Sequence, residues 1–256
     1  MRALLGFLAA RWPDDSSARR LLCFHHAGAG AMAFAGWQRR VGPGVTVLPV
    51  RLPGRESLRH EAPVTEAATL VEALTQELGP LLDAPYAFYG HSLGALVAYR
   101  FAHHLIEAGH RGPELLAVGA CPAPQSPSRL LAGAAAPGPT DEELVGLLVD
   151  GASVPEAMLA RRGWLRATVR TLRADLRLAA GLRETAPTTL PCPLWAFAGT
   201  DDPLVGVAQV GAWRHCTTAQ FRLRTVSGGH FFVRGREAPR AVAEALHTVM
   251  PVPRTA

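Results

Sequence analysis

Three side chains of this sequence have the types that acyl transfer through a serine requires: Ser92, Asp202 and His230. A serine hydroxyl becomes a nucleophile when a base takes its proton, and a carboxylate orients the imidazole that acts as that base. Along this chain the three occur in the order serine, acid, histidine. The three residues therefore indicate hydrolysis of an acyl compound.

Ser92 lies in the turn Gly90–Gly94, which has the pattern G-x-S-x-G. Residues Tyr86–Tyr89 before it have the pattern of a short buried strand, and the apolar run Ala95–Ala102 after it has helical periodicity. So sharp a turn needs glycine on both sides and exposes the serine hydroxyl at the helix N-terminus, where the helix dipole favours negative charge. The pattern alone also fits a glycine-rich turn with an incidental serine, so the strand–turn–helix context carries the prediction.

The orienting acid is predicted in the turn that follows the apolar run Leu194–Ala198. Asp202 is the third residue after the glycine of this turn, the usual position of the acid, and Pro203 makes the turn rigid behind it. Asp201 is a competing candidate that the sequence does not separate from Asp202. An acidic turn with no catalytic role is the alternative interpretation of this segment.

His230 is the one of ten histidines that follows a late strand, Phe221–Val226, on a loop with two glycines. The aromatic residues after it can pack its ring beside the sheet. His91 flanks the nucleophile, and packing is the role expected for it. The remaining candidates lie on or beside predicted helices and are expected to have no catalytic role: His103, His104, His110, His215 and His247.

Two backbone N–H groups are needed to stabilise the oxyanion of the tetrahedral intermediate. One is expected from Leu93, directly after the nucleophile, and the other from the small-residue loop after the first strand. Ala27 is the preferred donor in that loop, with Gly28 second. A phosphate-binding loop is the alternative, but neither G-x-G-x-x-G nor G-K-S/T follows.

Strand-like and helix-like runs alternate along the chain, which predicts an α/β fold with a mostly parallel central sheet and helices on both faces. The expected strands are Leu21–His25, Val45–Leu52, Tyr86–Tyr89, Glu114–Ala120, Leu194–Ala198 and Phe221–Val226. The expected helices are Thr65–Leu82, Leu93–Ala108, Val207–His215 and Ala238–Val249. Residues from about 122 to 190 have helical runs but no strand, so residues 1–256 are predicted to form one domain with a helical lid inserted at 122–190.

Composition argues against several other classes of protein. The net charge is +5, and all 26 basic residues are arginines without an interleaved aromatic motif, which argues against nucleic acid as a partner. The four cysteines are far apart and show no metal-binding spacing, so no metal site is expected, and Cys23 and Cys192 are predicted to be structural thiols. No run reaches the ~18–20 apolar residues of a membrane span, and the N-terminal apolar run is too short for a secretory signal. That run is expected to be a first strand or edge segment, and the protein is expected in the cytoplasm, away from membranes.

Nearly the whole chain resembles the type II thioesterases of polyketide synthase and nonribosomal peptide synthetase systems, which are α/β-hydrolases. The motifs that carry the resemblance are Leu22–Gly28 (L-C-F-H-H-A-G), Arg51–Glu56 (R-L-P-G-R-E), the elbow Gly90–Gly94, Leu172–Leu176 (L-R-A-D-L), Leu190–Pro193 (L-P-C-P) and Gly229–Phe232 (G-H-F-F). Two positions depart from the family pattern, because His25 replaces the usual proline and Ala29 the usual glycine. Both changes lie beside Ala27 in the proposed oxyanion loop.

The resemblance implies a serine thioesterase that removes acyl groups from the phosphopantetheine thiol of an acyl carrier or peptidyl carrier protein. It implies the triad Ser92, His230 and Asp202, an oxyanion hole formed by Ala27 and Leu93, and no metal or cofactor. The first alternative is a lipase or carboxylesterase that uses the same triad on small or lipid esters. The second is a catalytically inactive hydrolase fold that serves as a binding module.

A row of arginines recurs at helical spacing in the predicted lid. Its members are Arg162, Arg166, Arg170, Arg173 and Arg177. The spacing places them on one face of a helix, where an exposed charge row is most often a solvated surface. The alternative is a surface that attracts an acidic carrier protein.

Overall fold

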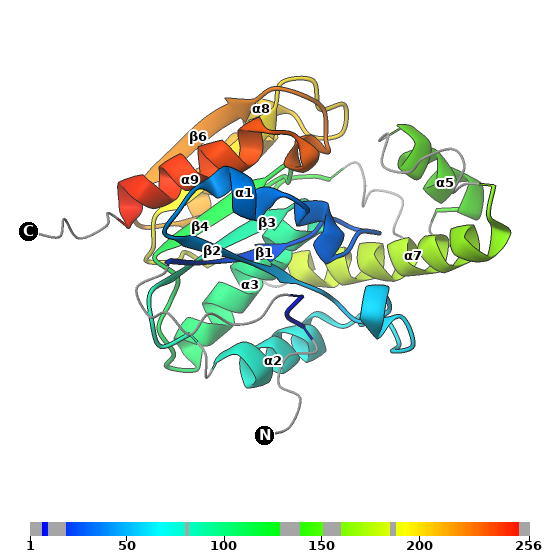
Figure 1. Cartoon of the computed structure of the whole chain (residues 1–256), viewed down its shortest axis with the longest axis horizontal. Coiled ribbons are helices and arrows are strands. Elements are labelled where there is room, and N and C mark those ends of the chain that lie inside the picture. Colours follow the sequence, from blue (N-terminus) through cyan, green and yellow to red (C-terminus); the bar gives the residue numbers. More distant parts are fainter. Residues whose placement is uncertain are drawn as a thin grey trace, which may run out of the picture.

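The computed structural model describes residues 7–9, 19–79, 82–128, 139–150, 160–184 and 188–250. Its centre is a six-stranded sheet with the strand order β2-β1-β3-β4-β5-β6, in which every neighbouring pair is parallel (Figure 1). The strands are β1 (Arg19–Phe24), β2 (Val45–Val50), β3 (Tyr86–His91), β4 (Leu115–Gly119), β5 (Leu194–Gly199) and β6 (Phe221–Val226). The predicted α/β fold with a parallel sheet is confirmed.

Helices cover both faces of the sheet, which explains why β1, β3, β4 and β5 are buried at every residue. On one face lie α1 (Trp37–Val41) and α9 (Glu237–Val249), which contact each other. On the other lie α2 (Ala67–Leu78) and α3 (Leu93–Glu107), and α8 (Val207–Gly211) packs beside β5 (Figure 1). Each face has its own apolar core, and the parallel sheet separates the two.

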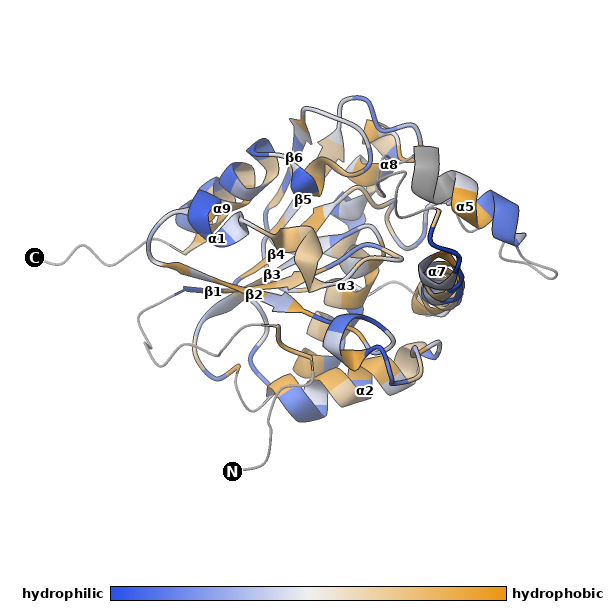
Figure 2. Ribbon diagram, turned by 45° about the vertical axis from the view of Figure 1, so that its right-hand side comes forward, coloured by the Kyte–Doolittle hydropathy of each residue, from blue (hydrophilic) through white to orange (hydrophobic). Residues whose placement is uncertain are grey.

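The segment between β4 and β5 contains helices α5 (Asp141–Asp150) and α7 (Arg162–Glu184), and its described residues form no strand before Leu190. The C-terminal part of α7 packs on α2 and α3 through Leu178 and Leu182, which belong to the main core. Its middle part forms a small separate cluster with Leu144 of α5. Helix α7 extends beyond the edge of the sheet, and α5 lies at its far end (Figure 1). Figure 2 views α7 almost along its axis.

All six predicted strands are present, with ends that differ by up to two residues. The predicted helix Thr65–Leu82 is shorter in the structure, because it begins at Ala67 and ends at Leu78 before the cap Gly79. The predicted single helix Val207–His215 is wrong: α8 ends at Gly211 and a 3₁₀ turn follows, which buries Trp213. Leu8 forms an isolated antiparallel bridge with Val50, so this part of the N-terminal run lies at the sheet edge, as expected.

In the part of the chain that the structure describes, none of the helices combines the length and the apolar character needed to cross a bilayer.

Candidate active site

Ser92 sits between β3 and α3 in a backbone conformation that non-glycine residues rarely adopt, with φ +54° and ψ −117°. The neighbouring chain is so close that a Cβ on Gly90 would overlap the carbonyl of Gly94, and a Cβ on Gly94 would overlap that of Phe24. Only glycine fits at both positions, which is the physical reason for the spacing in G-x-S-x-G. The Ser92 N–H donates to Gly119 O at 2.8 Å and ties the turn to β4.

The three side chains predicted as a triad lie within hydrogen-bond distance of one another. His230 Nε2 is 3.1 Å from Ser92 Oγ, and His230 Nδ1 is 2.9 Å from Asp202 Oδ2. The Asp202 side chain is fully buried, and its other oxygen accepts from the N–H groups of Leu204 and Val205 at 2.8 and 3.1 Å. These bonds fix the orientation of the carboxylate, so that it can direct the imidazole.

Asp201, the competing candidate, is exposed and does not face the imidazole. Its Oδ2 accepts from the hydroxyl of Thr200 at 2.7 Å, and its N–H donates to Gly228 O at 3.1 Å. The geometry thus separates two adjacent aspartates that the sequence left open.

The sequence predicted that His91 only packs beside the nucleophile. In the structure it also makes hydrogen bonds through both ring nitrogens. Its Nε2 is 2.7 Å from His230 O and its Nδ1 is 2.9 Å from the hydroxyl of Tyr89. Because a carbonyl only accepts, Nε2 carries the proton and donates, and Nδ1 accepts from Tyr89. Burial, together with the charge of the nearby His230, lowers the pKa of His91 to about 3. The neutral ring therefore holds the backbone of the loop that carries His230.

Aromatic rings surround the other side of His230. Phe231 stands at right angles to His230, with the ring centroids 5.1 Å apart, and its ring also contacts His26 at 4.8 Å. His26 is buried, and desolvation followed by the charges of the surrounding histidines and Arg234 holds its pKa well below its usual value. The Phe231 ring thus packs against the imidazoles of both His230 and His26.

The candidate oxyanion donors Ala27 and Leu93 lie on the loop after β1 and at the first residue of α3. Among the described residues, neither N–H has a protein acceptor. The N–H of Gly28, the second-choice donor, already donates to Asp175 Oδ2 at 2.8 Å. Of the two candidate donors in this loop, Ala27 is thus the one whose N–H has no competing acceptor among the described residues.

Metal sites and reactive cysteines are two other kinds of site to consider among the described residues. No group of three or more metal-ligating side chains occurs among them. The four cysteines are buried free thiols, and burial raises the pKa of Cys121 and of Cys192 to about 12. Burial fits the expectation of structural thiols at Cys23 and Cys192, because a reactive cysteine needs a lowered pKa and access to solvent.

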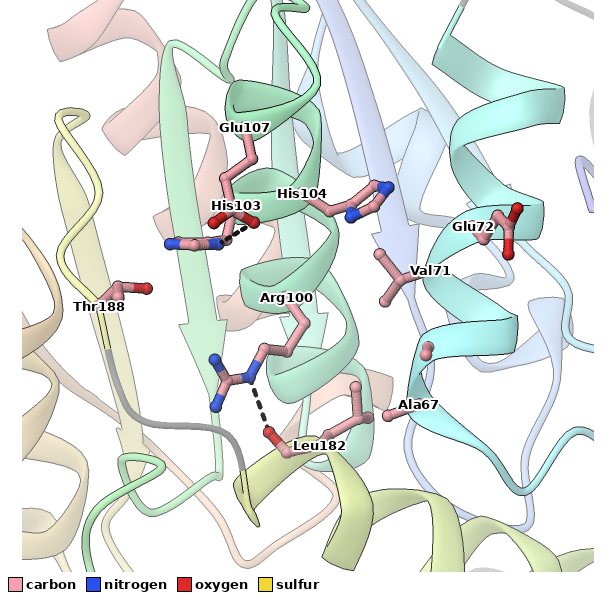
Figure 3. Close-up of a pocket in the computed structure, with 10 residues that line it drawn as sticks. Ala67, Val71, Glu72, Arg100, His103, His104, Glu107, Leu182 and Thr188 are labelled. Atoms are coloured by element: carbon pink, nitrogen blue, oxygen red, sulfur yellow. Dashed lines mark hydrogen bonds and ion pairs between the residues drawn. The ribbon is translucent and has the colours of Figure 1, made fainter.

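A cavity of about 510 Å³ lies between α2, α3 and the end of α7, away from the serine (Figure 3). Two polar contacts join residues of its lining: Arg100 donates to Leu182 O at 2.8 Å, and His103 lies 3.0 Å from Glu107. None of its lining residues belongs to the three-residue hydrogen-bonded chain. It therefore adds nothing to the chemistry at Ser92.

A parallel sheet with a strained serine after β3 and a histidine after β6 defines an α/β-hydrolase. Residues 19–250 match the thioesterase domain family, and the chain belongs to that family. It is 33% identical to a probable cadicidin biosynthesis thioesterase of Streptomyces griseus, over 93% of this chain and 67% of that protein.

Solved structures agree with this assignment. The thioesterase RedJ from the prodiginine pathway of Streptomyces coelicolor is 34% identical, with a TM-score of 0.82 and 94% of each chain covered. BorB, the type II thioesterase of the borrelidin cluster, is 30% identical, with a TM-score of 0.79 over 93% of this chain and 96% of that one. The resemblance to type II thioesterases is confirmed, and the protein is a thioesterase.

Proposed function

We propose that this thioesterase hydrolyses acyl groups from the phosphopantetheine thiol of acyl carrier or peptidyl carrier proteins in polyketide or nonribosomal peptide biosynthesis. The observation that carries the proposal is the hydrogen-bonded chain Ser92–His230–Asp202 in a chain related to biosynthetic thioesterases. Such an enzyme clears stalled or incorrect acyl groups from a synthase. In this proposal the protein acts in the cytoplasm together with its synthase.

In the first half-reaction, His230 Nε2 takes the proton from Ser92 Oγ as the oxygen attacks the thioester carbonyl. Asp202 orients the imidazole and stabilises the imidazolium that forms. The N–H groups of Ala27 and Leu93 donate to the oxyanion of the tetrahedral intermediate. As that intermediate collapses, His230 returns the proton to the leaving thiolate, and an acyl-Ser92 ester remains.

In the second half-reaction, His230 takes a proton from a water molecule that attacks the acyl-Ser92 ester. A second oxyanion forms at the same two N–H groups and collapses with protonation of Ser92 Oγ. The products are a free carboxylic acid and regenerated enzyme, and the scheme uses no metal or cofactor. The helices α5 and α7 serve as the lid of the single domain in this proposal, because they interrupt the βα alternation between β4 and β5.

The experiment is a comparison of three reactions on the purified protein: hydrolysis of acyl-loaded carrier proteins, hydrolysis of simple oxygen esters, and labelling by a fluorophosphonate. We expect labelling at Ser92 and a higher kcat/KM for carrier-bound thioesters than for esters. Labelling with preference for simple esters would indicate a lipase or carboxylesterase. No labelling of the native protein would indicate a binding module.

A further inference from the structure

The turn L-P-G-R-E and the segment R-A-D have no role in the chemistry so far, yet they meet in the structure. Arg55 and Asp175 form an ion pair with two N–H···O contacts, of 2.7 and 2.8 Å. The pair is buried, with side chains 8% and 0% exposed. Taking two charges out of water is unfavourable unless the remaining donors and acceptors are satisfied, so the partners of this pair indicate what it does.

Those partners are the backbone of the loop that contains Ala27. Asp175 Oδ2 accepts from the N–H of Gly28 at 2.8 Å, and Arg55 Nη1 donates to the carbonyl of Ala29 at 2.9 Å. The ion pair therefore holds the loop at an N–H and at a C=O one residue apart. Arg55 approaches the loop from the turn after β2, and Asp175 approaches it from helix α7.

The residue after Arg55 binds the 3₁₀ helix Ala31–Phe34, which directly follows the same loop. Glu56 Oε1 accepts from the N–H of Met32 at 3.0 Å, and Glu56 itself has a left-handed backbone, with φ +52°. A Cβ on Gly30 would overlap the Glu56 carboxylate, so any side chain there would displace Glu56 from its present position. The strained backbone at Glu56 is thus part of the same support.

These contacts determine the direction of the Ala27 N–H through the neighbouring peptide. The carbonyl of His26 shares a peptide plane with the N–H of Ala27, and the planar bond points the two in opposite directions. That carbonyl accepts from Ala29 N–H at 3.2 Å and is 2.9 Å from His25 Nδ1. Asp175 holds Gly28 and Arg55 holds Ala29, so together they fix the Ala29 N–H that lies between these two contacts. Because this N–H donates to the His26 carbonyl, the peptide plane that carries the Ala27 N–H is fixed as well.

We infer that Arg55, Asp175 and Glu56 are positioning residues for the oxyanion hole, which set the Ala27 N–H toward the carbonyl that Ser92 attacks. This inference rests on the proposed function. Asp175 belongs to α7, so part of the support for the oxyanion loop comes from the segment inserted between β4 and β5. The opposing account is a brace that only attaches α7 to the sheet.

The test separates positioning from bracing by removing both charges together. In Arg55→Met with Asp175→Leu, no unpaired charge is left in the core, so the melting temperature is expected to exceed that of either single variant. The bonds to Gly28 and Ala29 are nevertheless lost. We expect kcat for a decanoyl thioester of N-acetylcysteamine to fall on the order of 10²-fold, as when an oxyanion donor is removed, with KM within about threefold.

A second readout is inhibition by an alkyl trifluoromethyl ketone, which forms a tetrahedral oxyanion with the nucleophilic serine. Its inhibition constant should rise by about the same factor as kcat falls, because both report oxyanion stabilisation. Glu56→Ala alters a partly exposed contact and is the variant of least risk to folding; we expect roughly fivefold loss of kcat and an unchanged melting temperature. Arg224→Gln, in a partly exposed ion pair with Glu244, is the matched control and should match wild type in both readouts.

A folded double variant with wild-type kcat and inhibition constant would overturn the inference. If the double variant does not fold, Glu56→Ala with wild-type values in both readouts would overturn it. Failure of the proposed function gives a different result, namely no hydrolysis of any thioester and no Ser92 labelling in the wild-type protein.

Discussion

The catalytic loops and helix α7 both contribute to the site, but they are attached to the molecule in different ways. The loops after β3, β5 and β6 are held by backbone hydrogen bonds that continue the sheet, such as Ser92 N–H to Gly119 O and Thr200 N–H to Val226 O. Helix α7 reaches the site through side chains, namely Asp175 on Arg55 and a small apolar cluster with α5. In the proposed mechanism the two attachments have different consequences: the sheet holds the candidate triad, and side-chain contacts hold the loop of the candidate oxyanion donor Ala27.

The largest effect is expected at the groups that the sheet holds. Ser92→Ala and His230→Ala should each lower kcat by roughly 10⁴- to 10⁶-fold, because the nucleophile or its base is lost. Folding should change little, since Ser92 is partly exposed and His230 lies on a loop. Steady-state hydrolysis and circular dichroism measure the two effects. Near wild-type turnover in folded Ser92→Ala would refute a covalent mechanism.

The two adjacent aspartates sharpen the comparison within one turn. Asp202→Asn should reduce kcat by about 10²- to 10⁴-fold, because the amide no longer holds the required tautomer of His230 or stabilises its protonated form. Asp201→Asn, whose carboxylate faces Thr200, should lose less than a few-fold. Steady-state rates of the two matched variants decide the assignment. A larger loss in Asp201→Asn would move the acid by one residue.

The free energy of unfolding should decrease as the pH is lowered, because the site contains buried neutral histidines. Burial lowers the pKa of His25 to about 4 and that of His91 to about 3, against about 6.5 in the unfolded chain. Between pH 6.5 and 5 the unfolded state therefore binds more protons, and the free energy of unfolding decreases by up to about 1.4 kcal/mol per pH unit for each histidine.

Urea unfolding at a series of pH values measures this slope. His91→Gln retains a donor for His230 O and should reduce the slope by the contribution of one histidine. His60→Gln, at an exposed position, is the control and should leave the slope as in wild type. An unchanged slope in His91→Gln would show that His91 does not stay neutral in the folded protein.

The smallest effect is expected on the outer face of α7. Arg162, Arg166, Arg170 and Arg177 are exposed, whereas Arg173 is half-buried and bonds to Asp141 at 2.6 Å. If this face attracts an acidic carrier protein, Arg166→Glu with Arg170→Glu should raise KM for an acyl-carrier protein several-fold at low salt. A small acyl-pantetheine thioester should be nearly unaffected. Equal effects on both substrates, or none, would leave the row as a solvated surface.

Local sequence patterns predicted much of the fold, because strand and helix periodicity is a property of neighbouring residues. All six strands and the turn at Ser92 were predicted within a few residues. The helix Trp37–Val41 was not predicted, because five residues give too short a pattern to detect. The 3₁₀ turn after Gly211 was also missed, since burial of Trp213 and its bond to Cys121 O favour it, not local propensity.

The sequence by itself identified the candidate reacting groups: a serine that only a glycine-flanked turn can expose, a histidine after the last strand, and an acid in one turn. Tertiary structure alone placed Asp202, and not Asp201, against His230, gave His91 its bond to the His230 loop, and brought Arg55 to Asp175. The physical reason is distance along the chain, since Arg55 and Asp175 are 120 residues apart and Asp202 and His230 are 28 apart. Periodicity places each residue on its own element, but only the packed sheet and α7 determine which side chains meet.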